Sequence, residues 1–536
     1  MKNTKVLKTI TFLFLLSIFL LSLRIDYRFI ETINCCGDDH TYFVHAETIA
    51  EDFDLDYSNQ MNFVEGKVIM SGNKIVPIGF IGPGILSAPF VLFGNFIDNI
   101  LNFLNLNNSN IMNYKILIYS LSSVFYFFAC IFIFQKIFEL IGVSYKTTVL
   151  LLIFFGTGLH YYAFERYSMT HVYEVFSISL LIYALLLFYL GKSNINKVAG
   201  IIPYLFLISY LVRYVNYFIF FIPLWLTHLV KKETIDRKLI KNKYFLMNSG
   251  IAFSFLISIT NYLYGRITLN PIVVYNKESF PLVEDYISYS SEKGNIIVDN
   301  LIILFKMFFT QEFGLFWFSP IIVASILYLL FDIYKNFDVN VLPDFLILLS
   351  IGLPLGITLV WQTAGSAYGL RYTYAVIPIA LFTYFLISEK NNYKFLNKYV
   401  LIFSAFSFLS VLYFETSNLT SLSESEVLNS FGHYVRYAQP EYLTGVIGSL
   451  TSFNSYFVIF GTSFFGASII KLFSSIIGLE SFIDLLSQVG VSIDNTDVVR
   501  IFNNIDMIDG HKFIFIFCFL SLFSLYFTKQ IFKEYK

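Results

Sequence analysis

Charged residues and cysteines are scarce in this sequence. Lys, Arg, Asp and Glu make up 14% of the 536 residues, and the formal net charge is −1, whereas an average soluble domain is about 25% charged. A nucleic-acid-binding protein would need a basic excess, and four cysteines are too few for a disulfide scaffold. Hydrophobic residues make up 56% of the chain and aromatic residues 19%, which excludes a soluble or disordered protein. The composition therefore predicts an all-α integral membrane protein with many spans.

Apolar stretches that approach the length of a membrane span recur along the whole chain. A spanning helix needs about 20 apolar residues. Twelve stretches are predicted to cross: 7–23, 113–135, 147–163, 171–190, 198–212, 214–230, 245–264, 316–334, 343–361, 372–388, 398–414 and 511–529. The first follows three lysines and lacks a small-residue cleavage site, so we expect an uncleaved anchor.

Two further apolar stretches are expected not to cross fully. Residues 78–97 contain several glycines together with Pro83 and Pro89, which predicts a broken, re-entrant or interfacial segment. Residues 455–478 are rich in Ser and Gly and are expected to lie in the interface or to dip into it. The prediction is a bundle of about twelve spans, with eleven to thirteen as its range.

Basic residues orient this bundle. The segment 231–243 is the most basic in the chain, and cytoplasmic loops of membrane proteins carry an excess of Lys and Arg. Twelve spans place this segment, the other basic loops and both termini on the cytoplasmic side of the cytoplasmic membrane. The long outer loops are then 24–112, 265–315 and 415–510, and we expect 415–510 to pack onto the membrane face.

The first outer loop is acidic. Between Phe29 and Gly66 the chain has nine acids and no Lys or Arg. The adjacent acids Asp38 and Asp39 precede apolar residues at helical spacing, which predicts a helix with one face on the membrane and its acids toward water: Phe43, Ala46, Ala50 and Phe53 form the apolar face, with Glu47 and Glu51 opposite. One Asp before a helix commonly caps it. Asp39 as the cap would leave Asp38 free to accept a proton.

Two arginines stand at the predicted outer ends of spans. Arg213 follows the span 198–212 and Arg371 precedes the span 372–388. A charge within the hydrocarbon costs about 2.5–3.5 kcal/mol on insertion scales, and Arg binds phosphate with two parallel hydrogen bonds. Both are therefore candidate phosphate ligands, with interfacial snorkelling beside an acid as the alternative. Arg166 is a third candidate, although the adjacent Glu165 offers it a structural ion pair.

Several stretches on the predicted outer side carry a resemblance to a known family. They are Gly37–Glu47, Asp54–Asn59, Ile78–Gly84, Glu165–His171, Val212–Asn216, Gly314–Pro320 and Trp361–Tyr372. In this order they resemble C-type (GT-C) membrane glycosyltransferases, which include protein O-mannosyltransferases and lipid A aminoarabinose transferases. The resemblance covers about residues 1–390 and implies a GT-C-like transmembrane bundle with juxtamembrane helices in the first outer loop. Residues 391–536 form a C-terminal region without a resemblance.

The resemblance assigns roles residue by residue. Asp38 becomes the catalytic base and Asp39 its neighbour, while Arg213 and Arg371 bind the donor phosphate. A Lys-Pro-rich motif of the family is replaced here by Ile78–Gly84, and Lys74 is the candidate substitute. The remaining candidate substrate-binding residues are His40, Tyr42, Asp54, Asp56, Glu165, Arg166, His171 and Tyr368. No cofactor is implied, and a divalent metal at Asp38 and Asp39 stays an open alternative.

These observations predict a glycosyltransferase of the cell envelope. The expected reaction moves a sugar from a polyprenyl-phosphate donor to a hydroxyl of a glycan, lipid or protein acceptor on the outer, periplasmic face of the membrane. One alternative is an enzyme like an O-antigen ligase or polymerase, with His433 and Arg436 in the late outer loop. Another is a transporter or flippase of lipid-linked sugars. Acids are scarce in the predicted spans, which favours surface chemistry over transport.

Overall fold

The computed structural model describes most of the chain. The described residues are 12–13, 16, 20, 33, 38–60, 68–71, 74–77, 79–104, 113–143, 145–164, 166–231, 237–269, 296–309, 314–335, 341–361, 369–390, 393–417, 427–428, 434–435, 453–492, 501–502, 505, 518, 521–526 and 528–529. Most of the predicted span 7–23 and about half of the predicted span 511–529 therefore lie outside the described residues. Within the described part the regular structure is helical apart from two short pairs of antiparallel strands.

The helices and strands follow in chain order. The first group is α3 (Asp38–Glu51), β1 (Val68–Ser71), β2 (Lys74–Pro77), α4 (Gly82–Phe103), α5 (Tyr114–Ile141), α6 (Thr147–Phe155), α7 (Leu159–Phe164), α8 (His171–Tyr189) and α9 (Ile195–Val212). The second is η1 (Asn216–Phe221), α10 (Ile222–Lys231), α11 (Arg237–Ile240), α12 (Lys243–Tyr264), α14 (Ile296–Phe309), α15 (Leu315–Phe318), α16 (Pro320–Lys335) and α17 (Leu342–Trp361). The third is η3 (Arg371–Val376), α18 (Ile377–Lys390), α19 (Lys394–Ser417), β3 (Val427–Leu428), β4 (Tyr434–Val435), α21 (Phe453–Thr462), α22 (Phe464–Ile477) and α23 (Leu479–Gln488).

Six helical segments of the described chain are long and apolar enough to cross a membrane. They are Gly82–Phe103, Tyr114–Ile141, His171–Tyr189, Ile195–Val212, Lys243–Tyr264 and Arg371–Glu389. This is the fold of an all-α, membrane-embedded protein, as the composition predicts, whereas the predicted count of about twelve spans is not confirmed. Several predicted spans consist of two short helices: α6 and α7 replace 147–163, and η1 and α10 replace 214–230.

A close helix contact accounts for one of these interruptions. Gly156 follows α6, and a Cβ atom at this position would lie 2.4 Å from the main-chain oxygen of Ser404 in α19. Only glycine allows the two main chains to approach so closely. The helix therefore ends where it meets α19, and α7 starts again at Leu159.

The apolar stretch after β2 differs from its prediction. Residues 82–103 form one unbroken helix, so of the three expected forms the broken one is wrong, while a re-entrant or interfacial placement stays a prediction. Pro83 lies in the first turn, where its missing N–H leaves no helical bond unmade, and the helix continues past Pro89. In the late stretch 455–478, by contrast, a break at Ser463 separates α21 from α22.

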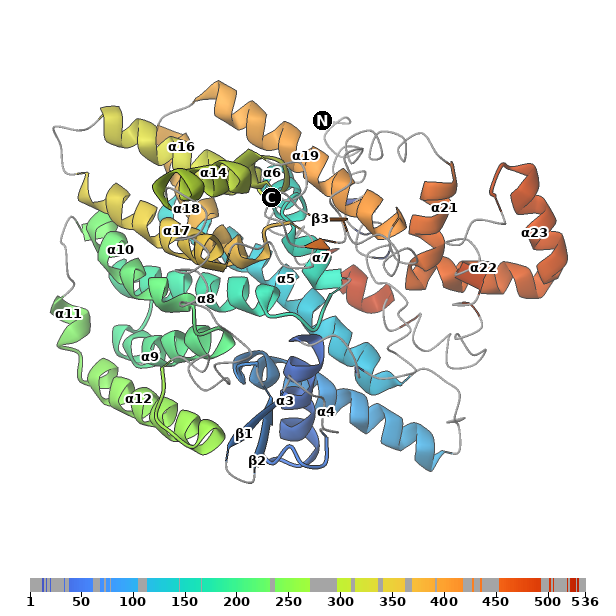
Figure 1. The fold of residues 1–536 in the computed structure, drawn as a ribbon, viewed down its shortest axis with the longest axis horizontal. Coiled ribbons are helices and arrows are strands. Elements are labelled where there is room, and N and C mark those ends of the chain that lie inside the picture. Colours follow the sequence, from blue (N-terminus) through green and yellow to red (C-terminus); the bar gives the residue numbers. More distant parts are fainter. Residues whose placement is uncertain are drawn as a thin grey trace.

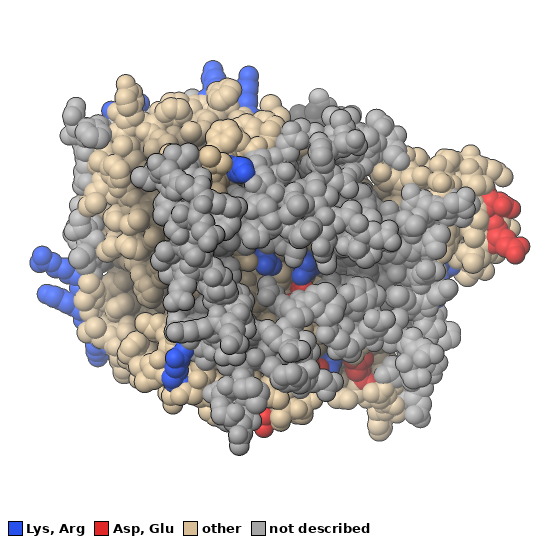
Figure 2. All heavy atoms as spheres, viewed as in Figure 1, with Lys and Arg blue, Asp and Glu red and all other residues tan. Residues whose placement is uncertain are grey.

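The long helices pack around α5, which is the most deeply buried of the six, and α8, which is buried to the same extent as the segment Arg371–Glu389. In Figure 1 α8 crosses the middle of the molecule, with α9 and α12 below it and α17 and α16 above it. Helix α3 packs on α4, α4 packs on α5, and α8 packs on α9, so the acidic helix lies against the bundle. Figure 2 shows Lys and Arg at the left and upper margins of the same view, and acids over α23 at the right.

Candidate functional site

Helix α3 begins at Asp38, so the acidic pair lies at a helix N-terminus. Asp39 is 1% exposed, and its Oδ2 accepts a hydrogen bond from Nη2 of Arg166. The Ser168 hydroxyl donates to the main-chain oxygen of Asp39 at 2.6 Å and lies 2.8 Å from the hydroxyl of Tyr119. We expected Asp39 to cap the helix. Its carboxylate instead binds Arg166, because a carboxylate buried this deeply needs a cation.

Lys115 of α5 fixes the middle of α3. Its Nζ lies 2.5 Å from a carboxylate oxygen of Glu47 and 2.9 Å from one of Glu51. Glu51 is exposed, as predicted, whereas Glu47 is only partly exposed. The prediction that the apolar face rests on the membrane is wrong. Phe43 is 1% exposed and packs on Tyr119, with ring centroids 4.9 Å apart, because α4 and α5 cover this face. Burial raises the pKa of Glu47, and the nearby Lys115 only partly offsets this rise.

The chain turns sharply after α3. The helix ends at Glu51, and Phe53 has a φ of 58° and is 76% exposed, so it does not belong to the buried face that its spacing predicted. The main-chain N–H of Asp56 donates to Oδ1 of Asp54 at 3.0 Å, and that of Ser58 donates to Oδ1 of Asp56 at 3.2 Å. These exposed acids thus form local turns. Their substrate-binding role stays a prediction.

His45 joins three segments of the first loop. Its Nε2 lies 2.7 Å from the main-chain oxygen of Gly79, and its Nδ1 lies 2.7 Å from the hydroxyl of Tyr57. A carbonyl oxygen only accepts, so Nε2 carries the proton and Nδ1 accepts from Tyr57. Burial lowers the pKa of His45 to about 4, although the bond to Gly79 raises it slightly. The ring is therefore neutral at pH 7 and ties α3 to the segment before α4.

The structure brings the two predicted phosphate ligands together. The guanidinium carbon of Arg213 lies 4.8 Å from the ring centroid of Tyr372, and that of Arg371 lies 4.9 Å from the same centroid. Nη2 of Arg371 also donates to the Tyr372 hydroxyl at 3.0 Å. Two cations that are far apart in the sequence therefore share one aromatic ring. We name Arg213, Arg371 and Tyr372 the arginine cluster.

A buried acid lies beside the arginine cluster. Glu174 of α8 is 0% exposed, and its Oε2 lies 3.4 Å from Nη1 of Arg213 and 3.4 Å from Nδ1 of His171. Burial would lower the pKa of Arg213, but Glu174 and nearby tyrosine hydroxyls raise it above its ordinary value, so this side chain stays charged. The turn after Arg213 is fixed by Asn216, whose Nδ2 donates to the main-chain oxygen of Ser209 at 2.9 Å.

Glycines bring the acidic helix and the arginine cluster together. A Cβ atom at Gly82 would lie 2.3 Å from the main chain of Leu211, two residues before Arg213, so α4 begins directly against the end of α9. A Cβ atom at Gly79 would lie 2.5 Å from Cε1 of Tyr42 in α3. Tyr42, a predicted substrate-binding residue, lies near enough to Arg213 to contribute to the raised pKa of that guanidinium. The glycines of the family-like stretch thus serve close packing.

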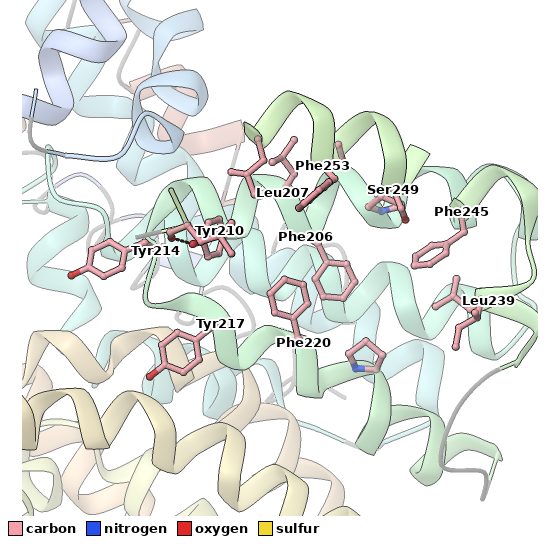
Figure 3. Close-up of a pocket in the computed structure, with 16 residues that line it drawn as sticks. Phe206, Leu207, Tyr210, Tyr214, Tyr217, Phe220, Leu239, Phe245, Ser249 and Phe253 are labelled. Atoms are coloured by element: carbon pink, nitrogen blue, oxygen red, sulfur yellow. Dashed lines mark hydrogen bonds between the residues drawn. The ribbon is translucent and has the colours of Figure 1, made fainter. Parts of the chain in front are cut away.

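An apolar groove begins next to the arginine cluster. It lies between α9, η1, α10, α11 and α12, with a volume of about 790 Å³, and Figure 3 shows the aromatic side chains that line it. Its lining residues are Pro203, Phe206, Leu207, Tyr210, Tyr214, Tyr217, Phe220, Pro223, Leu239, Ile240, Phe245, Ser249, Ala252, Phe253, Leu256 and Leu269. Tyr214 follows Arg213 directly, so one end of the groove adjoins the cluster.

The remaining predicted site residues differ in how much of them the structure describes. His40 is buried in α3, and its substrate role stays a prediction. Glu165 and Tyr368 lie outside the described residues, as do His433 and Arg436 of the alternative enzyme class. Lys74 belongs to β2 and Asp38 to α3, but their side chains also lie outside the described part. Within the described residues no group of three or more His, Cys, Asp and Glu side chains is arranged to hold a metal ion.

Glu174 is the site residue that sequence reasoning missed. The prediction described the spans as nearly free of acids and passed over the one acid that α8 carries near its start. Glu174 stands three residues after His171, which places both on one face of a helix. An ionisable residue within an apolar span is by itself a signal for a functional site, and this signal was available in the sequence.

The described fold and site define a class rather than a particular protein: an all-α membrane-embedded protein with an acidic helix, an arginine cluster and an apolar groove side by side. No model of a known protein family matches the chain, and no curated protein or solved structure matches it either. The function must therefore be argued from the site.

Proposed function

We propose that the protein is a glycosyltransferase that uses a polyprenyl-phosphate-linked sugar as its donor. One observation carries this proposal: Arg213 and Arg371 converge on Tyr372 at the end of an apolar groove. A lipid phosphate has the same two parts, an anionic head and a long apolar chain. Cations at the leaving phosphate stabilise the negative charge that develops there during sugar transfer.

The groove suits the prenyl chain. Its lining on α12 runs from Phe245 to Leu256, a rise of about 16 Å along the helix. That is roughly half of the hydrocarbon thickness of a bilayer. Aromatic and aliphatic side chains dominate the lining, so an isoprenoid chain would bury mostly apolar surface there.

The acidic pair supplies the proposed base. Because the carboxylate of Asp39 is bound by Arg166, the proton of the acceptor hydroxyl falls to Asp38, the first residue of α3. Tyr42, one turn further along α3, lies near Arg213 and contributes to its raised pKa. The base is thus proposed to stand on the same helix that borders the donor phosphate, which is the arrangement that transfer to a hydroxyl requires.

The charge distribution supports a site on the outer face. Asn242, at the end of the basic segment, donates from Nδ2 to Oδ1 of Asn196 near the start of α9 at 3.0 Å, and Arg213 stands at the other end of α9. The 18 residues of α9 span about 27 Å. If the basic segment is cytoplasmic, the arginine cluster lies at the opposite side of the membrane.

Binding of a lipid phosphate tests the donor site. The purified protein in lipid nanodiscs is titrated with a radiolabelled polyprenyl monophosphate. We expect Arg213→Ala and Arg371→Ala each to weaken binding by about tenfold or more, since a hydrogen bond between charged partners contributes about 1.5–3 kcal/mol. Arg237→Ala, an exposed arginine of α11, is the matched control. Unchanged binding in both cluster variants would reject the donor site.

Transfer itself tests the base. With lipid-linked donor extracted from source membranes, Asp38→Asn is expected to lower the transfer rate by about 10²–10⁴-fold, because a positioned general base contributes that much. The variant should fold and bind lipid phosphate normally. Asp484→Asn, an exposed acid of α23, is the control. Retained transfer in Asp38→Asn would remove Asp38 from the mechanism.

One observation favours a second candidate, a transporter of lipid-linked sugars. Glu174 and His171 are buried within a helix that is long enough to span, and such acids often mark proton pathways. Movement of a lipid-linked sugar across proteoliposomes, without transfer to an acceptor, would support this function instead.

A further inference from the structure

Glu174 is a buried acid that the proposed reaction does not use. Its side chain is 0% exposed, and among the described residues no hydrogen-bond partner reaches its Oε1. Its Oε2 makes two contacts of 3.4 Å, to Arg213 and to His171, which are long for bonds between charged groups. A carboxylate in this state is incompletely satisfied, although burial makes each missing partner costly.

The charge of Glu174 affects how strongly the arginine cluster attracts an anion. A negative charge beside Arg213 offsets part of the attraction that this guanidinium exerts on a bound anion, and the offset is large because Arg213 is only 12% exposed. The same charge keeps Arg213 from being a buried cation without a partner when no anion is bound. A site that must bind a lipid phosphate and then release it gains from such an internal anion.

We infer that Glu174 is a positioning residue that acts as the internal counter-ion of Arg213 and limits how tightly the site holds a lipid phosphate. In the empty site it binds Arg213 and keeps that guanidinium beside Tyr372. When a phosphate arrives, it competes with Glu174 for Arg213. This inference rests on the proposed function and adds to it the control of phosphate release.

The test separates the charge of Glu174 from its shape. Glu174→Gln keeps one oxygen for Arg213 but removes the negative charge, so it should bind polyprenyl monophosphate about tenfold more tightly than the unaltered protein. Its turnover should fall while its KM for the donor also falls, because the product lipid phosphate leaves slowly. A residue that only stabilised the fold would not tighten binding. Ser179→Ala, a buried residue further along α8, should change neither quantity.

Further variants keep the test decisive. Glu174→Asp retains the charge but draws it away from Arg213, so we expect a smaller tightening, and this variant decides the matter if Glu174→Gln does not fold. Combining Glu174→Gln with Arg213→Ala should abolish the tightening, because the effect acts through Arg213.

Three results would overturn the inference. The first is equal or weaker binding in the variants of Glu174 that fold, and the second is a tightening that persists without Arg213. Either would leave the proposed function standing if the unaltered protein still binds lipid phosphate through the arginine cluster. The third, absence of lipid-phosphate binding by the unaltered protein, would overturn both.

Discussion

The acidic region 38–60 and the arginine cluster use charge in different ways. In the acidic region most described carboxylates have direct bonds: Asp39 binds Arg166, and Glu47 and Glu51 share Lys115. At the arginine cluster Glu174 makes contacts of 3.4 Å, and the two guanidinium groups lie over the ring of Tyr372. A concentration of acids in the sequence therefore marks structure as much as chemistry, and we propose the arginine cluster as the place where charge meets a ligand.

The bonded pair Asp39–Arg166 gives the largest expected effect. It tests whether the acids of the region 38–60 serve the stability of the fold. Asp39→Asn leaves Arg166 without its carboxylate in a largely buried place, and losing one partner of a buried pair costs about 3–5 kcal/mol. We expect the free energy of unfolding to fall by roughly that amount, measured by thermal unfolding in nanodiscs. A loss below about 1 kcal/mol, the value of exposed pairs, would show that Asp39 and Arg166 do not behave as a buried ion pair.

Lowering the pH should destabilise the acidic region 38–60 through protonation of His45. The pKa of His45 is about 4 in the folded protein and about 6.5 in an unfolded chain. Between these values the unfolded chain binds a proton that the folded protein does not, so stability falls as the pH falls from 6.5 toward 4. The contribution lost is at most about 3 kcal/mol.

The test for His45 compares how steeply the melting temperature falls with pH in two proteins. Melting temperatures of the unaltered protein and of His45→Gln are followed from pH 7.5 to 5, and the unaltered protein should lose stability more steeply. Other histidines titrate equally in both, so they cancel in the difference. Parallel curves would mean that His45 is accessible to protons in the folded state.

The smallest effect is expected at the exposed turn acids. Asp54→Asn keeps an oxygen that can accept the main-chain bond from Asp56, so the free energy of unfolding should change by less than about 0.5 kcal/mol. A raised KM for the acceptor with unchanged stability would support the predicted substrate role of Asp54. Unchanged KM would leave Asp54 as a turn residue only.

The sequence predicts local features of this fold well. It places the acidic helix directly after the pair Asp38 and Asp39, within two residues of its start at Asp38, and it identifies Phe43, Ala46 and Ala50 as one apolar face, which is buried in the structure. It does not show what covers that face, because helical spacing is the same against lipid and against α5. Nor does it predict that Phe53 leaves the face, since the helix has already ended at Glu51.

Only those residues of the candidate site whose chemical type is itself informative could be predicted from the sequence. Arg213 and Arg371 were candidates because arginine is costly in a membrane, and the structure places both at Tyr372. Their shared ring depends on the packing of α9 against α8 and of η3 against α8, which no local pattern encodes. The groove likewise depends on how α9, α10 and α12 are arranged around it.

The central claim is that the arginine cluster binds the phosphate of a lipid whose chain fills the groove. A cryo-EM structure with bound polyprenyl monophosphate tests it most directly. The account predicts phosphate density within hydrogen-bond distance of Arg213 and Arg371, and chain density along Tyr214, Phe206 and Phe253. Phosphate bound elsewhere, for example at the basic segment 231–243, with an empty groove would contradict the account.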